Sequence, residues 1–219
     1  MVADNKIIGG DSPYLVVVGP QNSNRDERIR DVVLERNWFQ AANNLTQKAL
    51  VIHSSETTVR NNICDMTGGS SGATCVLVTL QGPSPAPAPD NIRLYNNTAF
   101  KGDASPGNDY SPVLVNIDTT STNVTVQNNK AYAPAYASAV LVSGAGASGL
   151  VMSNNSTNAQ IVSVFPGWVS STPATPADFR ITADSYAKAA GVATVPVFSD
   201  FFQANRLAGI PGMGAVAAP

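Results

Sequence analysis

Charged residues are scarce in this chain. They make up 13% of its 219 residues, and 13 basic against 15 acidic side chains give a net charge of −2. A protein that grips nucleic acid or an anionic membrane surface normally carries a strong excess of basic residues. We therefore expect no nucleic-acid partner. Long apolar runs are absent too, since none approaches the ~18 residues of a membrane span.

Histidine and cysteine are almost missing: there is one histidine, His53, and there are two cysteines. Without a His/Cys cluster we expect no metal site and no cofactor. A catalytic histidine needs a nucleophile or an orienting acid beside it, and the sequence near His53 offers only Ser54, Ser55 and Glu56. We interpret His53 as structural.

Cys64 and Cys75 flank the loop-like stretch "DMTGGSSGAT". A disulfide across this loop would suit an exported protein. The alternative is a pair of small buried residues in an intracellular chain. The first residues, "MVADNKIIGG", lack the features of a signal peptide. Strand-like sequence begins by residue 7, so we expect a mature chain or a fragment that lacks N-terminal coils.

Turn-forming residues are abundant by contrast, with 17 glycines and 15 prolines, and 43% of the chain is hydrophobic. Helix-forming residues are not concentrated anywhere for long. This composition favours an all-β chain with many turns. The hydrophobic fraction is large enough for one domain with a sizeable core.

A short apolar strand that ends in a polar pair recurs five times, for example as "RLYNNTAF" and "TVQNNKAY". Aligned on the second polar residue, the repeats fall at Asn37, Asn62, Asn97, Asn129 and Asn155, with spacings of 25, 35, 32 and 26. A second apolar strand alternates with the first, and its aligned leucines are Leu15, Leu50, Leu77, Leu114 and Leu141. Each repeat therefore carries two short strands and a loop of variable length.

Repeats with a period of 20–50 residues indicate a solenoid, a propeller or an array. Two or three short strands with elastic loops fit a parallel β-helix, in which each unit is one coil and successive coils pair with each other. We predict a right-handed parallel β-helix of about six coils over residues 1–190, with coils from near residue 7 to about 182. An irregular tail over 191–219 is expected to cap its C-terminal end. The right hand follows the usual crossover rule.

The repeated asparagines have a structural interpretation. Asparagine tolerates left-handed backbone at a sharp corner, and its amide can bond to the asparagine one coil above. We predict that these five asparagines turn the corner and form a buried ladder.

The coils resemble the right-handed parallel β-helix proteins of the pectate-lyase-like superfamily. The tail strengthens the resemblance, because Asp200, Phe201 and Arg206 match an Asp–Phe–x–Gly–x–Arg phrase near the end of many exported members. "SYAKAAG" is a loose version of a preceding phrase, and Met213 replaces a terminal aspartate. The resemblance implies a fold but not one activity: the superfamily holds polysaccharide lyases, glycosidases, epimerases, phage tailspikes and non-catalytic surface proteins.

Period-2 alternation assigns the faces of the Asn-terminated strands. Val32, Leu34, Thr57, Val59, Ile92, Leu94, Val124, Val126, Leu150 and Met152 should point inward. The outward face then places Glu35, Arg60 and Tyr95 in one column, with Arg93 diagonally next to Arg60. Such a cluster could grip a uronate carboxylate and stack on a sugar. The alternative is an ordinary solvated face with a Glu–Arg pair.

The second strand series is apolar on both faces, so its leucines or their valine neighbours should meet a covering element. Loops could supply it, but we favour a homotrimer slightly.

Two functions fit. The first is a carbohydrate-active β-helix that holds a glycan, preferably an acidic polysaccharide, along the Asn-terminated strands, with lyase or hydrolase chemistry left open. Hydrolysis needs two carboxylates, and Glu35 has none stacked beside it. The second is a non-catalytic surface or phage-spike module. Both functions lead us to expect an extracellular, cell-surface or virion location.

Overall fold

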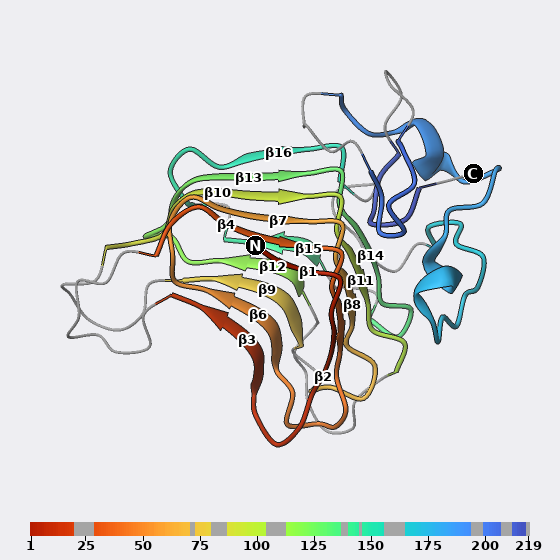
Figure 1. Ribbon diagram of the computed structural model, residues 1–219, viewed down its shortest axis with the longest axis horizontal. Coiled ribbons are helices and arrows are strands. Elements are labelled where there is room, and N and C mark those ends of the chain that lie inside the picture. Colours follow the sequence, from red (N-terminus) through yellow and green to blue (C-terminus); the bar gives the residue numbers. More distant parts are fainter. Residues whose placement is uncertain are drawn as a thin grey trace.

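The computed structural model describes residues 1–19, 29–70, 73–79, 87–103, 113–136, 140–144, 146–155, 165–193, 199–206 and 212–217. Within these ranges nearly all regular structure is β-strand, and the strands form three parallel sheets. Figure 1 shows the sheets wrapped around one core.

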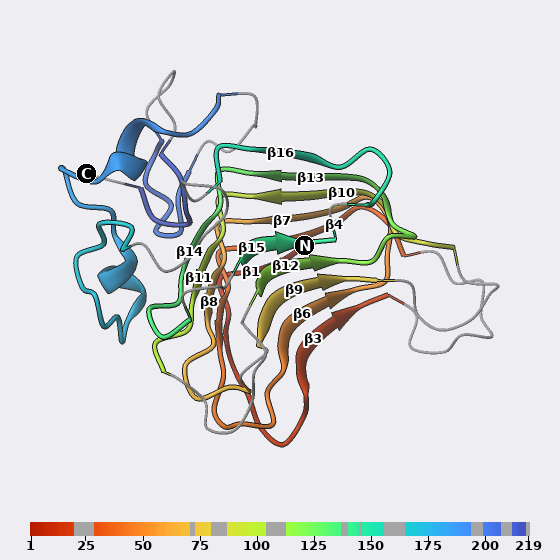
Figure 2. The same ribbon diagram turned by 180° about the vertical axis from the view of Figure 1, so that it is seen from behind.

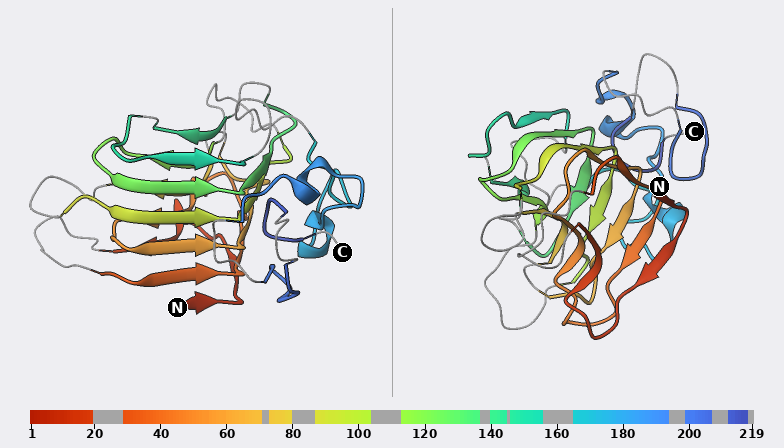
Figure 3. Two further views of the ribbon diagram at one scale, coloured as in Figure 1. Left: turned by 90° about the horizontal axis from the view of Figure 1, so that it is seen from above. Right: turned by 60° about the vertical axis from the view of Figure 1, so that its left-hand side comes forward.

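Sheet A contains the Asn-terminated strands. Its order is β1 (Val2–Ala3), β4 (Val32–Glu35), β7 (Thr57–Arg60), β10 (Asp90–Tyr95), β13 (Thr122–Gln127) and β16 (Val151–Ser153). Sheet C contains the second, doubly apolar series: β3 (Tyr14–Val18), β6 (Lys48–Ile52), β9 (Thr74–Val78), β12 (Val113–Ile117) and β15 (Val140–Ser143). The strands of each sheet lie one above another, as Figure 3 shows for sheet A.

Sheet B is a third series that the repeat did not reveal: β2 (Lys6–Ile8), β5 (Trp38–Gln40), β8 (Ile63–Asp65), β11 (Thr98–Phe100) and β14 (Lys130–Tyr132). Each of these strands has only three residues and follows directly after the asparagine corner. The chain passes from sheet A to B to C and then begins the next coil, which gives a right-handed parallel β-helix (Figures 1 and 2). Coiling starts at Val2, earlier than the predicted residue 7.

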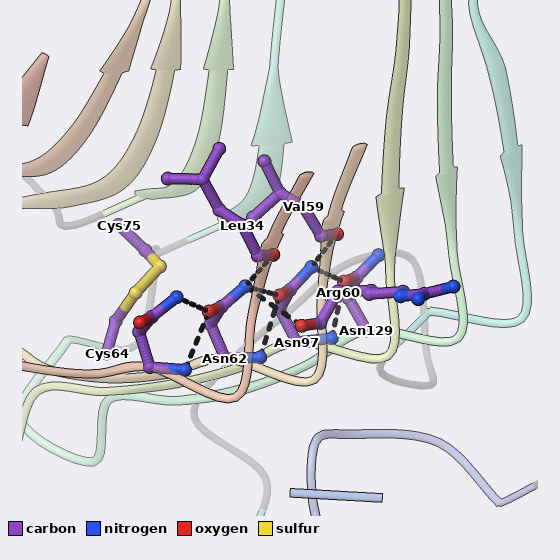
Figure 4. Close-up of a disulfide and its surroundings, with 9 residues drawn as sticks. Leu34, Val59, Arg60, Asn62, Cys64, Cys75, Asn97 and Asn129 are labelled. Atoms are coloured by element: carbon purple, nitrogen blue, oxygen red, sulfur yellow. Dashed lines mark hydrogen bonds between the residues drawn. A yellow bond between two sulfur atoms is a disulfide. The ribbon is translucent and has the colours of Figure 1, made fainter. Parts of the chain in front are cut away.

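The core lies inside the coils, and sheet A supplies one wall of it as the alternation predicts. The register places Leu34, Val59, Leu94, Val126 and Met152 in one column. All but Met152, which belongs to the last strand, are buried. Cys64 at the inner face of sheet B and Cys75 in β9 form a disulfide between two strands of one coil, with Cα atoms 5.7 Å apart (Figure 4).

At the corner between sheets A and B, two adjacent residues share the roles that the sequence analysis gave to one asparagine: the left-handed turn and the ladder of amide hydrogen bonds. The ladder residues are the predicted five together with Asn5; the Nδ2 of Asn62, for example, donates to the Oδ1 of Asn97 at 3.0 Å (Figure 4). Left-handed backbone falls instead on the residue before each: Asp4, Arg36, Asn61, Asn96, Asn128 and Asn154, with φ from 49° to 61°. One residue turns the chain, and the next stacks.

The described part of the tail, residues 165–193, 199–206 and 212–217, includes the 3₁₀ helices η1 (Pro176–Phe179) and η2 (Tyr186–Ala189) and lies along the outer face of sheet B (Figure 2). There it buries Ile63 and Phe100 against Trp168 and Phe179. That the tail caps the C-terminal end of the stack stays a prediction. The last stacked strand ends at Ser153, so the described strands stop well before the predicted boundary at residue 190.

The turning asparagines attach the tail to the coils. Nδ2 of Asn154 donates to Ala190 O, Asn128 exchanges two bonds with Val192, and Asn61 donates to Ser199 O. Asn96 donates to Gly212 O. The guanidinium of Arg206 completes the attachment by donating to Asn61 Oδ1 and to the carbonyl oxygens of residues 199, 212, 214 and 215.

The aligned leucines of sheet C do not pair with one another. Leu50 pairs with Val16 and lies in the core, whereas Val51 belongs to the outward column, whose backbone register runs on through residues 77 and 116. The side chains of Leu77, Leu114 and Leu141 lie outside the described part of the molecule. The outward column continues to Ser143, so it turns polar in the last two coils.

Candidate functional site

The outward face of sheet A has the register that the alternation implied. Arg60 of β7 pairs with Glu35 of β4 on one side and with Tyr95 of β10 on the other. Arg93 pairs with Thr58, two residues before Arg60, and so lies diagonally from it. The same column runs on to Gln127 and Ser153, whose side chains are joined by a 2.7 Å hydrogen bond. Polar side chains therefore follow one another across five coils.

Glu35 is enclosed by two arginines, one of which the sequence analysis did not single out. Its Oε2 accepts from Nε of Arg60 at 2.5 Å, and its Oε1 accepts from Nη1 of Arg36. Arg36 in turn makes a bidentate pair with Asp4, at 2.8 and 2.9 Å. This pair lowers the pKa of the Asp4 carboxyl. Glu35 is only 5% exposed although it lies on the outer face.

Arg36 stands where the other complete coils have a turning asparagine, with φ of 52°. The sequence signal was available, because "VVLERNWF" has Arg where its relatives along the chain have Asn. The consequence is an alternating row of four charges, Asp4–Arg36–Glu35–Arg60, that is neutral as a whole.

Arg93 is the exposed cation of this face. Among the described residues it forms no ion pair and no hydrogen bond with another side chain, and its charge acts on the nearby hydroxyl of Tyr95. Burial nevertheless raises the pKa of Tyr95, so its hydroxyl stays protonated and donates or accepts hydrogen bonds. The face thus offers one available guanidinium, a second one shared with Glu35, and a half-buried phenol.

A cleft of about 420 Å³ lies at the other end of sheet B, between its strand ends and tail residues 171–174. Asp65 and Asp103 both line it, together with Gln40, Thr67 and the ring of Phe100. The sequence analysis singled out neither aspartate. Each follows a ladder asparagine closely, Asp65 by three residues and Asp103 by six, and this was the signal that could have joined them.

The environments of the two carboxyls push their pKa values apart. Burial is the main cause that raises the pKa of Asp65, and the charge of Asp103 adds to it. The pKa of Asp103 is lowered, because bonds from Lys101 Nζ at 2.7 Å and from Gly68 N outweigh its desolvation. An acid and a base with separated pKa values are a common arrangement for proton transfer.

His53 is buried, and its Nδ1 lies 2.8 Å from the carbonyl oxygen of Thr79. It has the fixed orientation expected of a structural histidine. No group of three or more histidine, cysteine, aspartate or glutamate side chains that could hold a metal ion occurs among the described residues.

Within the described ranges, the structure has no helix that combines the length and the apolar character needed to cross a membrane. A scan against protein-family models, a search of curated proteins and a search of solved structures each returned no match. The interpretation of function therefore depends on the geometry of these surfaces.

Proposed function

We propose that the protein binds an acidic polysaccharide along the outward face of sheet A. Glu35, Arg60, Arg93 and Tyr95 are the proposed contacts, and the scaffold is a parallel β-helix that resembles those of the pectate-lyase-like superfamily. The observation that carries the proposal is Arg93, an exposed guanidinium without an ion-pair partner among the described residues, beside Tyr95 and Arg60.

The chemistry of the ligand follows from the charges. The four charges of the row Asp4–Arg36–Glu35–Arg60 sum to zero. The exposed Arg93 therefore leaves this face with a local surplus of one positive charge. A uronate carboxylate can accept two parallel bonds from a guanidinium, and the ring of Tyr95 offers a surface to the sugar. Polar side chains repeated coil after coil suit a repeating polymer, since several weak contacts add.

Calorimetric titration of uronate oligosaccharides tests this proposal. The parent should bind, and a variant with Arg60→Ala and Arg93→Ala should lose about tenfold or more in affinity. Arg180→Ala is the matched control, because it removes one exposed arginine from the tail and leaves sheet A intact. No heat with the parent, or equal affinity in the double variant, means that the face only contacts solvent.

The alternative function is a non-catalytic structural module of a cell surface or a phage spike. The internal satisfaction of Glu35 by Arg36 and Arg60 favours it, since a carboxylate held in this way is poorly placed to act on a substrate. Absence of uronate binding together with high thermal stability would support this alternative.

If the polymer is cleaved, we place hydrolysis at the Asp65–Asp103 cleft rather than on sheet A. The supporting observation is the opposite direction of their two pKa shifts in one cavity. Reducing-sugar release from a panel of polysaccharides tests it. Asp103→Asn should abolish that release while the control Arg180→Ala leaves it unchanged, and activity that survives Asp103→Asn would exclude the cleft.

The homotrimer and the extracellular location stay predictions. Val51, in the outward column of sheet C, is 2% exposed in the single chain, so the chain itself covers this position. That observation favours coverage by the chain over coverage by a second subunit. Light scattering decides the question, because a trimer has three times the 22.7 kDa mass of the chain.

A further inference from the structure

A second kind of cavity, of about 270 Å³, lies where the chain passes from sheet C to sheet A. Its polar lining comes from the segment between β6 and β7, from the segment that precedes β4 and from the start of β10: Arg30, His53, Ser54, Ser55, Glu56 and Asp90. The volume is close to the lower end of the range for small-molecule sites, ~300 Å³. The cavity shares no residue with the cluster on sheet A.

The hydrogen bond of His53 places a proton on its Nδ1. A carbonyl oxygen can only accept, so Nδ1 must donate to Thr79 O and carries the proton. In the neutral imidazole, Nε2 then has a lone pair and can only accept. No hydrogen bond from another described residue reaches Nε2, and the side chain is 8% exposed. Nε2 is thus the ring nitrogen that remains for a ligand in the cavity.

The other polar groups are mainly acceptors as well. Glu56 pairs with Arg30 at 3.6 Å across a half-exposed rim. Asp90 accepts bonds from Thr122 and Asn123 on Oδ1, at 2.6 and 2.8 Å, and no side-chain bond among the described residues is made to its Oδ2. Two carboxylates against one guanidinium give the cavity a net negative charge, which disfavours an anionic ligand.

We propose that this cavity binds one neutral sugar residue, whose hydroxyl groups donate to Nε2 of His53 and to the carboxylates of Glu56 and Asp90. A hydroxyl-rich ligand supplies the donors that the lining lacks, and it carries no charge for the carboxylates to repel. The apolar side chains of Ile29, Pro87 and Ala88 complete the lining and fit the C–H face of a sugar ring. The inference does not depend on polysaccharide binding at sheet A.

The single histidine makes the test specific, because one imidazole signal in a ¹H–¹⁵N spectrum reports on this cavity alone. The probes are the methyl glycosides of glucose, galactose, mannose and xylose, with methyl galacturonoside and glucosamine as charged comparisons. We expect a saturable shift of the His53 signal with at least one neutral glycoside and none with the uronate. The proposal is overturned if no neutral glycoside shifts the signal, or if only a charged probe does.

A matched pair of variants separates binding from structure. His53→Asn keeps an amide N–H near the position of Nδ1, so it retains the bond to Thr79 O but removes Nε2. We expect its melting temperature to stay close to that of the parent while affinity for the active glycoside falls by about tenfold or more. Glu56→Gln, at an exposed position, should weaken binding with the fold intact, so the test remains decisive if His53→Asn does not fold. Unchanged affinity in the folded variants contradicts the site.

Discussion

The outward faces of sheets A and B are built from the same coils, one corner apart, and yet they have opposite surroundings. On sheet A the outward residues carry charge and stay at the surface, as Arg93 and Arg60 do. On sheet B they are Ile63, Phe100 and Lys130, which the tail buries. The coil geometry alone therefore does not decide which face is available to a ligand; the segment after the last strand does.

Removal of the Arg206 side chain should have the largest effect on this difference between the two sheets, because it weakens the attachment of the tail that covers sheet B. The Arg206→Ala variant removes five hydrogen bonds, to four tail carbonyls and to Asn61 Oδ1, although the carbonyl oxygens of residues 199, 212 and 215 each keep another donor. We expect a loss on the order of 4 kcal/mol in the stability of the docked tail. Both tryptophans lie in this interface, so their fluorescence should report the release. Arg180→Ala is the control. A parent-like melting curve for Arg206→Ala would show that the tail is held by its apolar contacts alone.

Because the tail covers sheet B, the ammonium group of Lys130 is buried, and this burial should cost folding free energy. The side chain is fully buried, its Nζ lies 3.4 Å from Pro166 O and 4.0 Å from the ring centre of Tyr186, and burial lowers its pKa to about 7. An unfolded lysine titrates near ~10.4. The unfolded state therefore binds more protons between these values, and the stability of the parent should rise with pH from about 7 to about 10.

Lys130→Met removes this charge at similar volume. At pH 7 we expect the variant to be more stable than the parent by on the order of 2 kcal/mol, with the difference closing towards pH 10. Urea unfolding across this pH range measures it, with Lys188→Met, at an exposed position in η2, as the control. A pH-independent difference would mean that Lys130 keeps its proton in the folded state.

A substitution in the asparagine ladder, at the corner between sheets A and B, should affect the strands of both sheets. In Asn97→Ala, Asn62 N and Nδ2 lose an acceptor, and Val59 O and Asn129 Oδ1 lose a donor (Figure 4). We expect a cost of about 1–3 kcal/mol. Amide hydrogen exchange should speed up in β10 and β11 alike. Exchange confined to one sheet would show that the ladder does not couple them.

The smallest effect is expected on sheet A. Glu35→Gln removes the charge between Arg36 and Arg60, and we expect a loss of about 1 kcal/mol in unfolding free energy that shrinks as salt is added. Tail docking on sheet B should not change. A salt-independent loss would indicate that Glu35 acts by packing rather than by its charge.

Sheet A was predictable because its strands are long enough for alternation to show, and because the buried ladder demands an amide at each repeat. Sheet B was not: with three residues per strand, as in Trp38–Gln40, period 2 leaves almost no pattern. The register of sheet C did not follow from the aligned leucines, since alignment by residue type does not fix register, and Leu50 pairs with Val16 rather than Leu15. The Glu35–Arg60 pair followed from alternation, whereas Arg36 needed the left-handed corner that aims it at Glu35.

The bonds between the turning asparagines and the tail have a consequence for length. Asn61, Asn96, Asn128 and Asn154 belong to four successive coils, and the Nδ2 of each donates to a particular backbone carbonyl of the tail. The attachment points of the tail therefore lie one coil apart along the solenoid. A coil inserted or deleted between residues 61 and 154 would keep the asparagine ladder intact, but it would displace the attachment points on one side of the change relative to those on the other. The number of coils in this part of the solenoid is thus fixed by contacts with a segment whose described residues add no strand to the three sheets.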